Sequence, residues 1–335
     1  MADTQPNTDE GVDNVDKSAS VSIGCKRKRE QDSELDSDGN SRRRTRESNN
    51  SGDVSKNRTS IPTADYTVGW VGALPLEMAA ARGMLDEVYP NLPEQDPADH
   101  NSYILGEVQG HKVVIACLPA GIYGTTPAAT VAKDLLRTFK SIRFVLMVGI
   151  GGGAPSQELG RDLRLGDIVV RQPSGTSGGI IQYDRRKMVQ EGEFQRTGSL
   201  NEPPQVLLAA LSRLQADHLI EDSKMPQFLQ ELFSKIPERM KKKFSHQGVA
   251  NDHLFHAGYD HVSPDATCEQ CCDQSQTVKR DGRDDTDPVI HYGNIASGNL
   301  VIEDAKTRDR LGEELGGECS VSRRRPRGCR IFRAW

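Results

Sequence analysis

Hydrophobic and polar positions alternate along the middle of the chain in blocks that predict strands and helices by turns. Apolar runs of strand length occur at 66–71, 112–118, 144–148, 167–170 and 289–302. Apolar residues at helical spacing occur at 76–88, at 125–139 and twice within 203–243, and 303–314 is a helix candidate with capping-type acidic residues at its start. Strands that alternate with helices predict an α/β layer architecture, in which ligands bind beyond the carboxyl ends of parallel strands.

A glycine-rich turn follows one of these buried strands, within the sequence FVLMVGIGGGAPSQELGRDLRLGDIVV at 144–170. Gly149, Gly151, Gly152 and Gly153 lack Cβ atoms, so the backbone can reach positive φ and approach a bound molecule closely. Converging N–H groups in such a turn can bind an anion or a sugar hydroxyl. A tight turn after a core strand has the same pattern, and only part of the dinucleotide-binding G-x-G-x-x-G fingerprint is present.

The chain is expected to hold one substantial domain, at 64–317, between polar tails at 1–63 and 318–335. Its 335 residues are 35% hydrophobic and carry a formal net charge of −5, which gives no overall attraction to nucleic acid. No apolar run is long enough to span a bilayer, and no signal peptide is recognisable, so we expect no membrane partner. The seven scattered cysteines fit reduced thiols in an intracellular protein. A homo-oligomer remains open.

The N-terminal tail is almost free of large apolar residues and is predicted to be disordered. It carries two basic clusters, Lys26–Arg29 and Arg42–Arg46, separated by an acidic spacer. Two clusters at this spacing resemble a bipartite nuclear-localisation signal, which a nuclear import receptor would bind. A solvated polyampholyte tail is the alternative, so a cytoplasmic or a nuclear location is expected.

The segment 244–288 is polar and irregular and reads as an excursion from the domain. Within it, His261, Cys268, Cys271 and Cys272 could supply four tetrahedral zinc ligands. The spacing is not one of the standard zinc patterns, and the segment holds one C-x-x-C only. A reduced loop without metal is therefore the favoured interpretation, with zinc as the alternative.

Six segments together resemble the nucleoside phosphorylase superfamily, and in particular the phosphorylase-like N-terminal domains of fungal NLR-type proteins. They are VGWVGALPLEMAAARGML (69–84), PAGIYGTTPAATVAKDLL (119–136), VLMVGIGGGAPSQELGRDLRLGDIVV (145–170), GGIIQYD (178–184), FQRTGSLNEPPQVLL (194–208) and HYGNIASGNLVIEDAKTRDRL (291–311). The resemblance implies a three-layer α/β/α sandwich with a mixed, largely parallel central sheet. It also implies cleavage of the N-glycosidic bond of a purine or related nucleoside by water or phosphate.

The resemblance implies roles for single residues as well. Glu77 matches the acid/base glutamate of the nucleosidases, although a glutamate in a first helical turn is also favoured by the helix dipole. The sugar side of the nucleoside would face the turn of Gly149, Ile150, Gly151, Gly152 and Gly153. Further cleft residues on the same ground are Tyr183, Asp184, Arg196, Ser297, Gly298, Asn299 and Val301, the last in place of an aromatic residue that stacks on the base.

The resemblance leaves the nucleophile and the activity open. The phosphorylases hold phosphate with an arginine just after the first strand, whereas this chain has Ala-Leu-Pro-Leu at 73–76, which tilts the expectation toward hydrolysis. Arg185 or Arg196 could compensate, so inorganic phosphate stays an option as co-substrate; no other cofactor is expected. The alternative function is a non-catalytic nucleoside-binding or signalling module derived from an NLR-type receptor.

The chain departs from the family after Gly317, where the family continues with a buried strand and a ribose-holding F-E-M-E-A-A-G segment. Permitted codons for Cys319–Cys329, read two nucleotides in, encode Phe-Gly-Phe-Glu-Thr-Glu-Ala-Ala-Gly-Leu. We therefore expect a frameshift or mis-assigned exon near Gly317, with loss of final strands and an unpaired sheet edge. Transcript sequencing tests this: codons that cannot yield Glu-x-Glu-Ala-Ala in that frame would contradict it.

Overall fold

The computed structural model describes residues 60–156, 160–184, 186–188, 194–196, 200–263, 266, 268–300, 302, 304–314 and 321–322. The chain divides into two compact units, Met1–Val54 and Ser55–Trp335, and every described residue lies in the second. The two basic clusters and nearly all of the predicted N-terminal tail therefore lie outside the described residues, as does Val301.

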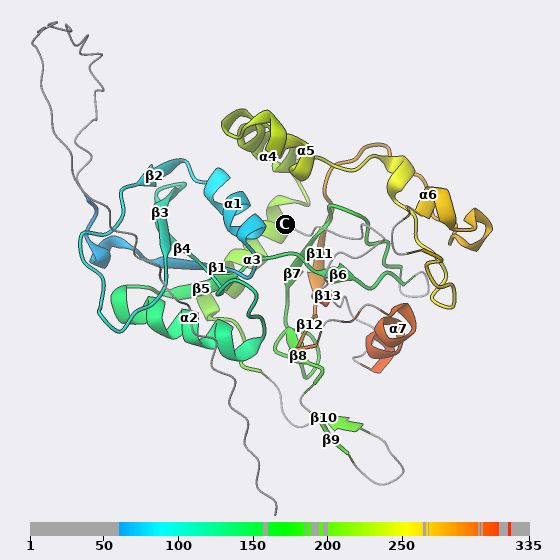
Figure 1. The fold of residues 1–335 in the computed structure, drawn as a ribbon, viewed down its shortest axis with the longest axis horizontal. Helices are drawn as coiled ribbons and strands as arrows, with labels where there is room; N and C mark the ends of the chain where they lie inside the picture. The colour runs from blue at the N-terminus through cyan, green and yellow to red at the C-terminus, as the bar shows by residue number, and fades with distance from the viewer. Residues whose placement is uncertain are drawn as a thin grey trace, which may run out of the picture. The chain divides into compact units, whose positions relative to one another are not determined.

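The largest sheet of the described unit is mixed and has five strands, in the order β2-β3-β4-β1-β5 (Figure 1). The strands are β1 (Val68–Gly72), β2 (Glu87–Tyr89), β3 (Tyr103–Val108), β4 (His111–Cys117) and β5 (Phe144–Met147). β1 pairs in parallel with β4 and with β5, whereas β3 pairs antiparallel with both β4 and β2. Parallel and antiparallel pairing in one sheet confirms the predicted mixed α/β class.

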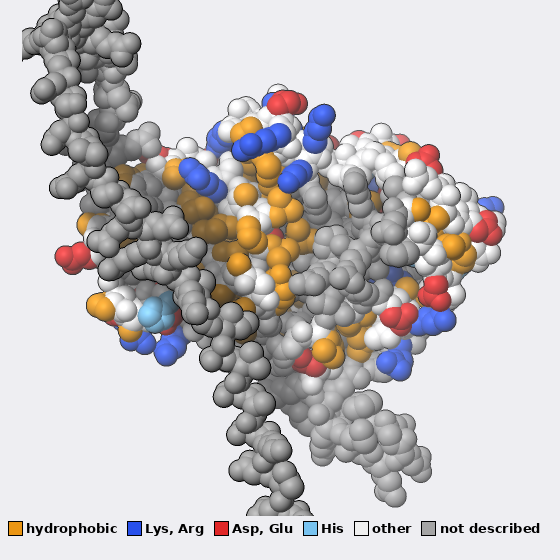
Figure 2. Space-filling view, in the orientation of Figure 1, with side chains coloured by type: hydrophobic (Ala, Val, Ile, Leu, Met, Phe, Trp, Pro, Cys, Tyr) orange, Lys and Arg blue, Asp and Glu red, His pale blue; other side chains and the backbone are white. Residues whose placement is uncertain are grey.

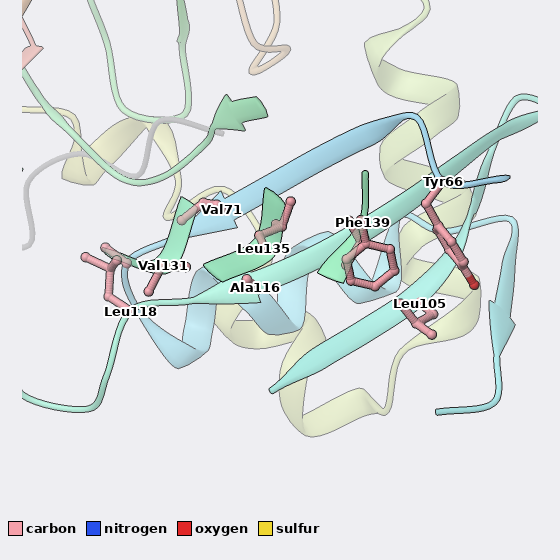
Figure 3. Packing of buried hydrophobic residues seen from close by; sticks show 10 residues of the cluster. Tyr66, Val71, Leu105, Ala116, Leu118, Val131, Leu135 and Phe139 are labelled. Atoms are coloured by element: carbon pink, nitrogen blue, oxygen red, sulfur yellow. The ribbon is translucent and has the colours of Figure 1, made fainter. Parts of the chain in front are cut away.

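Helices α1 (Pro75–Gly83) and α2 (Thr125–Thr138) cover opposite faces of this sheet. Alternate residues of a strand point to opposite faces, so Val114 of β4 packs in one cluster with Leu135 of α2, while its neighbour Ile115 packs in the other with Ala81 of α1. Figure 3 shows the α2-side cluster, in which Phe139 meets Tyr66 edge to face at 5.3 Å between ring centroids. The predicted three-layer arrangement is present.

The other elements extend this core. Further strands pair as β7 (Ile168–Arg171) with β11 (Ile290–Gly293) and β8 (Ile180–Gln182) with β12 (Ile295–Ser297), both parallel, and β9 (Arg186–Met188) with β10 (Phe194–Arg196), antiparallel. The remaining helices are α3 (Gln205–Asp217), α4 (Met225–Lys235), α5 (Glu238–Phe244), α6 (Cys268–Cys271) and α7 (Ala305–Glu314). Across the described ranges, no helix has both the length and the apolar character needed to cross a membrane.

Three local predictions differ from the structure. The helix predicted at 76–88 ends at Gly83, where an added Cβ would lie 2.4 Å from Leu232 Cδ1, and Glu87–Tyr89 forms a strand instead. β3 was not predicted. Gln109 and Gly110, which follow it, both have positive φ, as in the tight turn of a two-residue hairpin. The segment 203–243 forms three helices rather than two, because Pro237 separates α4 from α5.

The glycine turn is paired at its far end. β6 (Gly152–Gly153) pairs antiparallel with β13 (Val321–Ser322), two residues of the predicted C-terminal tail. This short pair lies apart from the five-stranded sheet, in which β5 pairs with β1 alone among the described strands, so the unpaired edge expected for that sheet stays a prediction.

Replacing Gly106 by alanine is expected to destabilise the β2–β3 edge. A Cβ there would lie 2.4 Å from the carbonyl oxygen of Glu87 and 2.6 Å from Leu85 Cδ1, so backbone must move. Overpacking of this kind costs about 1–3 kcal/mol in the free energy of unfolding, measurable by urea denaturation. The control is Gly258→Ala, whose Cβ meets nothing within 4 Å. Equal midpoints for the two variants would contradict the packing argument.

Candidate functional site

Glu77 lies in the first turn of α1 and its side chain is buried, at 8% relative exposure. One carboxylate oxygen, Oε2, accepts hydrogen bonds from the N–H groups of Ala73 (2.5 Å) and Leu74 (3.0 Å) in the loop between β1 and α1. The other oxygen, Oε1, accepts one from the N–H of Ile150 at 2.8 Å. Glu77 therefore ties the start of α1 to the glycine turn that follows β5.

Gly149 must be glycine because the turn approaches this carboxylate closely. A Cβ at Gly149 would lie 2.7 Å from Glu77 Oε1 and 2.9 Å from its Cδ. None of Gly149, Gly151, Gly152 and Gly153 has positive φ, so the predicted use of left-handed backbone here is wrong. The glycine requirement at Gly149 comes from close approach to Glu77.

A cavity of about 210 Å³ adjoins the same carboxylate. α1 and α4 supply much of its wall, and Val148, Gly149 and Ile150 of the turn also line it. The described lining is otherwise almost entirely apolar, with Glu77 as its charged group. Figure 2 shows hydrophobic side chains gathered on the face below α4 and α5, next to α1. The site can therefore hold an apolar group beside a buried carboxylate.

A buried ion pair fixes the strand that passes this cavity. Asp167 immediately precedes Ile168 of the cavity wall, and its side chain is 2% exposed. Arg283 donates to both of its oxygens, at 2.7 and 2.8 Å, and His291 Nε2 lies 2.9 Å from Oδ2. Burial raises the pKa of Asp167, but the hydrogen bonds from Arg283 and His291 outweigh that effect and hold the pKa well below its usual range.

Asp184 and Asn299 form a second group of predicted site residues, at the ends of β8 and β12. Asp184 Oδ2 accepts from the backbone N–H of Asn299 (2.7 Å) and from its side-chain amide (3.0 Å). Asn299 Oδ1 in turn accepts from the N–H of Thr125 at 2.9 Å and from its hydroxyl at 3.1 Å. Burial raises the pKa of Asp184, but the hydrogen bonds from Asn299 and from the Gln182 side chain leave it below the usual value. This group links β8, β12 and the start of α2.

Tyr183 and Gly298 pack against each other beside this group. A Cβ at Gly298 would lie 2.5 Å from Cζ of Tyr183, which is 5% exposed, and the tyrosine hydroxyl donates to the carbonyl of Leu300. Burial raises the pKa of Tyr183. Ser297 ends β12, and its carbonyl accepts from the N–H of Tyr183 at 3.0 Å. Tyr183 thus contributes to the packing of β8 against β12.

The structure brings the predicted residues together in two groups. The first group lies at the cavity and consists of Glu77, Gly149 and Ile150. The second group consists of Tyr183, Asp184 and Ser297 to Asn299, and none of these five residues is in the described lining of the cavity. Arg196 ends β10, and its side chain lies outside the described part, as does Val301.

Two features of the site were missed from the sequence. Thr125 joins the second group, and its signal was present in the quoted segment PAGIYGTT, where a hydroxyl residue begins a helix after glycine. The cavity wall from α4, including Phe228 and Leu232, was missed because an amphipathic pattern does not identify the partner of its apolar face.

Replacing Gly149 by alanine is expected to displace the Glu77 carboxylate and break its bond from Ile150. Loss of a hydrogen bond to a buried charged group costs about 1.5–3 kcal/mol, so the urea midpoint should fall accordingly. Gly282→Ala serves as control, since its Cβ meets nothing within 4 Å. A midpoint equal to that of the control would mean that the turn does not hold Glu77.

The fold and site so far define an α/β domain with a carboxylate at an apolar cavity. No protein-family model matches the chain. Over 270 residues it is 42% identical to a nucleotide-binding leucine-rich repeat (NLR)-like protein of Hyaloscypha variabilis. The match covers 81% of this chain and 26% of that protein, so the chain spans about a quarter of its relative. The predicted resemblance to an NLR-type protein is confirmed.

Solved structures of nucleosidases are also similar. One is 5′-methylthioadenosine/S-adenosylhomocysteine nucleosidase from Neisseria meningitidis in complex with methylthio-immucillin-A, at 15% identity and a TM-score of 0.40, covering 76% of this chain and 75% of that one. Another is futalosine hydrolase of Helicobacter pylori, at 12% identity and a TM-score of 0.42, covering 77% and 75%.

Proposed function

We propose that this chain binds a purine or related nucleoside and cleaves its N-glycosidic bond, with Glu77 as acid/base and the turn at 149–153 on the sugar side. The observation that carries the proposal is the buried Glu77 carboxylate at the wall of the cavity. Cleavage through an oxocarbenium-like transition state needs a carboxylate placed to accept a proton or to orient the attacking group.

The hydrogen bonds of Glu77 suit that role. An ionised carboxylate offers about four acceptor positions, and backbone N–H groups of Ala73, Leu74 and Ile150 occupy three of them. About one position is left for a water molecule or a ribose hydroxyl. Because all three donors are backbone, the carboxylate is held in one place before the substrate binds, which lowers the entropic part of the barrier.

The cavity has a size that fits one apolar part of a nucleoside rather than the whole molecule. Its volume of about 210 Å³ is below the range of about 300–1,000 Å³ usual for whole-ligand pockets. We infer that it holds either the base or an apolar substituent of the sugar, beside Glu77. Apolar walls also exclude competing water from the carboxylate, which strengthens its interactions with the ligand.

We propose water rather than phosphate as the nucleophile. The described lining of the cavity carries no lysine or arginine, whereas a bound phosphate is usually held by charge-assisted hydrogen bonds from such residues. Arg196 remains the residue to test if phosphate proves necessary. Turnover is proposed to be slow, because Cys319–Cys329 stand where the resemblance implies a ribose-holding segment.

A second function, nucleoside binding without turnover in a signalling protein, is supported by the 42% identity to an NLR-like protein. A panel of nucleosides, with and without phosphate, separates the two functions when thermal denaturation and chromatography of free base are run together. A raised melting temperature with base release supports cleavage, and a raised temperature without release supports the binding function. A folded protein that gives neither result would overturn both.

A further inference from the structure

One cysteine–histidine cluster lies outside the site described above, in the polar excursion at 244–288. His261 Nδ1 lies 3.0 Å from Cys272 Sγ, 3.8 Å from Cys268 Sγ and 3.9 Å from Cys271 Sγ. The sulfur atoms of Cys271 and Cys272 are 3.7 Å apart. The ligand atoms of His261, Cys268 and Cys272 all lie within 4.8 Å of one another.

These distances are close to the edges of a tetrahedral zinc site. With Zn–S of about 2.3 Å and Zn–N of about 2.0 Å, two sulfur ligands lie about 3.8 Å apart, and a sulfur and a nitrogen lie about 3.5 Å apart. The separations of His261 from Cys268, of His261 from Cys271, and of Cys271 from Cys272 fall within about half an ångström of these values. The distance from Cys272 Sγ to His261 Nδ1 is about half an ångström shorter than the sulfur–nitrogen value, so these two side chains must move slightly apart to bind the metal.

The histidine is oriented for such a ligand role. Its Nε2 lies 3.2 Å from the carbonyl oxygen of Ala266, a distance at which a protonated Nε2 donates a hydrogen bond to that oxygen. That bond makes Nδ1 the ring nitrogen that would bind the metal. Cys272 Sγ lies nearest to it, whereas Cys271 Sγ is 3.9 Å from both Nδ1 and Nε2 and has to turn toward Nδ1. Metal-bound histidines almost always make a second bond of this kind, which fixes the tautomer and the ring.

We propose that His261, Cys268, Cys271 and Cys272 bind one Zn²⁺ ion. Three thiolates and an imidazole, arranged as a tetrahedron, form a ligand set that favours zinc over magnesium, calcium or manganese. Cys271 and Cys272 are free thiols, whereas Cys268 is in a disulfide whose partner is not among the described residues. Cys268 becomes a ligand only after a thiol reductant has converted that disulfide into two thiols and has itself been oxidised to a disulfide, so zinc binds to the reduced chain.

A structural role follows from the place of the cluster in the excursion. Backbone bonds from Val278 to Leu254 (2.7 Å) and from His256 to Gln276 (3.0 Å) close the base of the segment 254–278. The proposed ligands lie beyond that closure, in a stretch with little buried apolar surface. A metal that joins His261 to α6 would order this stretch, since binding free energy at a structural zinc site contributes to folding.

The test uses the full chain, reduced and supplied with Zn²⁺, with bound metal measured by mass spectrometry after dialysis. We expect about one zinc per chain, and at least a tenfold lower content in Cys272→Ser and His261→Asn. Matched controls are Cys117→Ser, whose thiol lies on β4, and His253→Asn, from the same excursion. Both controls should keep wild-type zinc.

A second measurement does not depend on the folding of variants. The reduced wild-type chain loaded with Co²⁺ should give a thiolate charge-transfer band and the intense d–d bands of tetrahedral coordination. Substoichiometric zinc in the wild type, a spectrum of octahedral Co²⁺, or unchanged zinc in Cys272→Ser would each overturn the proposal.

Discussion

Replacing Glu77 by glutamine is expected to lower the rate of base release by about 10²- to 10⁴-fold, the usual contribution of a positioned acid/base group. Glutamine keeps the length of the side chain but cannot take up a proton at neutral pH. One of its two terminal atoms also becomes a donor, and it would face N–H groups that now donate to the carboxylate. The rate is measured by chromatography of the free base under single-turnover conditions.

Stability must be separated from chemistry in this variant. The mismatched amide is expected to cost about 1–3 kcal/mol in the free energy of unfolding, so rates are compared at a temperature where both proteins are folded by circular dichroism. Glu238→Gln is the matched control, because Glu238 lies on α5 with its side chain 79% exposed. Base release by Glu77→Gln at the rate of that control would remove Glu77 from the mechanism.

Replacing Arg283 by methionine is expected to lower the free energy of unfolding by about 3–5 kcal/mol, because it leaves the Asp167 carboxylate buried without its main partner. The double variant Arg283→Met with Asp167→Asn should lose less than Arg283→Met alone, since no buried charge remains. Urea denaturation measures both. A single variant no less stable than the double variant would show that Asp167 does not depend on Arg283.

The effect of Arg283→Met should depend on pH in a stated direction. Hydrogen bonds lower the pKa of Asp167 in the folded protein, so its contribution is fully present above the unfolded value of about 4. As pH falls below that value toward the folded pKa, the unfolded chain takes up the proton first and the contribution is lost. The difference between wild type and variant should therefore be constant from about pH 5 to 7 and shrink below about pH 4.

The layer architecture was predictable because its signals are local. β1, β4 and β5 are short apolar runs, and α2 has its apolar residues at helical spacing, so the α/β class followed from periodicity. The end of α1 and the existence of β3 were missed since both depend on packing. Gly83 approaches Leu232, a residue nearly 150 positions away, and β3 is fixed by its hairpin with β4.

The site was predictable in part and for a different reason. Glu77 and the glycine turn were identified by resemblance, and their contact through the Ile150 N–H could not be read from spacing. Asp184 and Asn299 were both named, but the hydrogen bonds that Asn299 accepts from Thr125 join residues 174 positions apart. The apolar wall from α4 had no sequence signal of its own, because only the fold brings it to α1.

The most direct test of the central claim is base release from unphosphorylated purine nucleosides by the full chain in H₂¹⁸O. Mass spectrometry follows the free base and the sugar, with phosphate both absent and present. We predict free base with ¹⁸O in the released ribose and no ribose 1-phosphate, at a rate that Glu77→Gln lowers by about 10²- to 10⁴-fold. Folded wild-type protein that binds these nucleosides yet releases no base would contradict cleavage by Glu77.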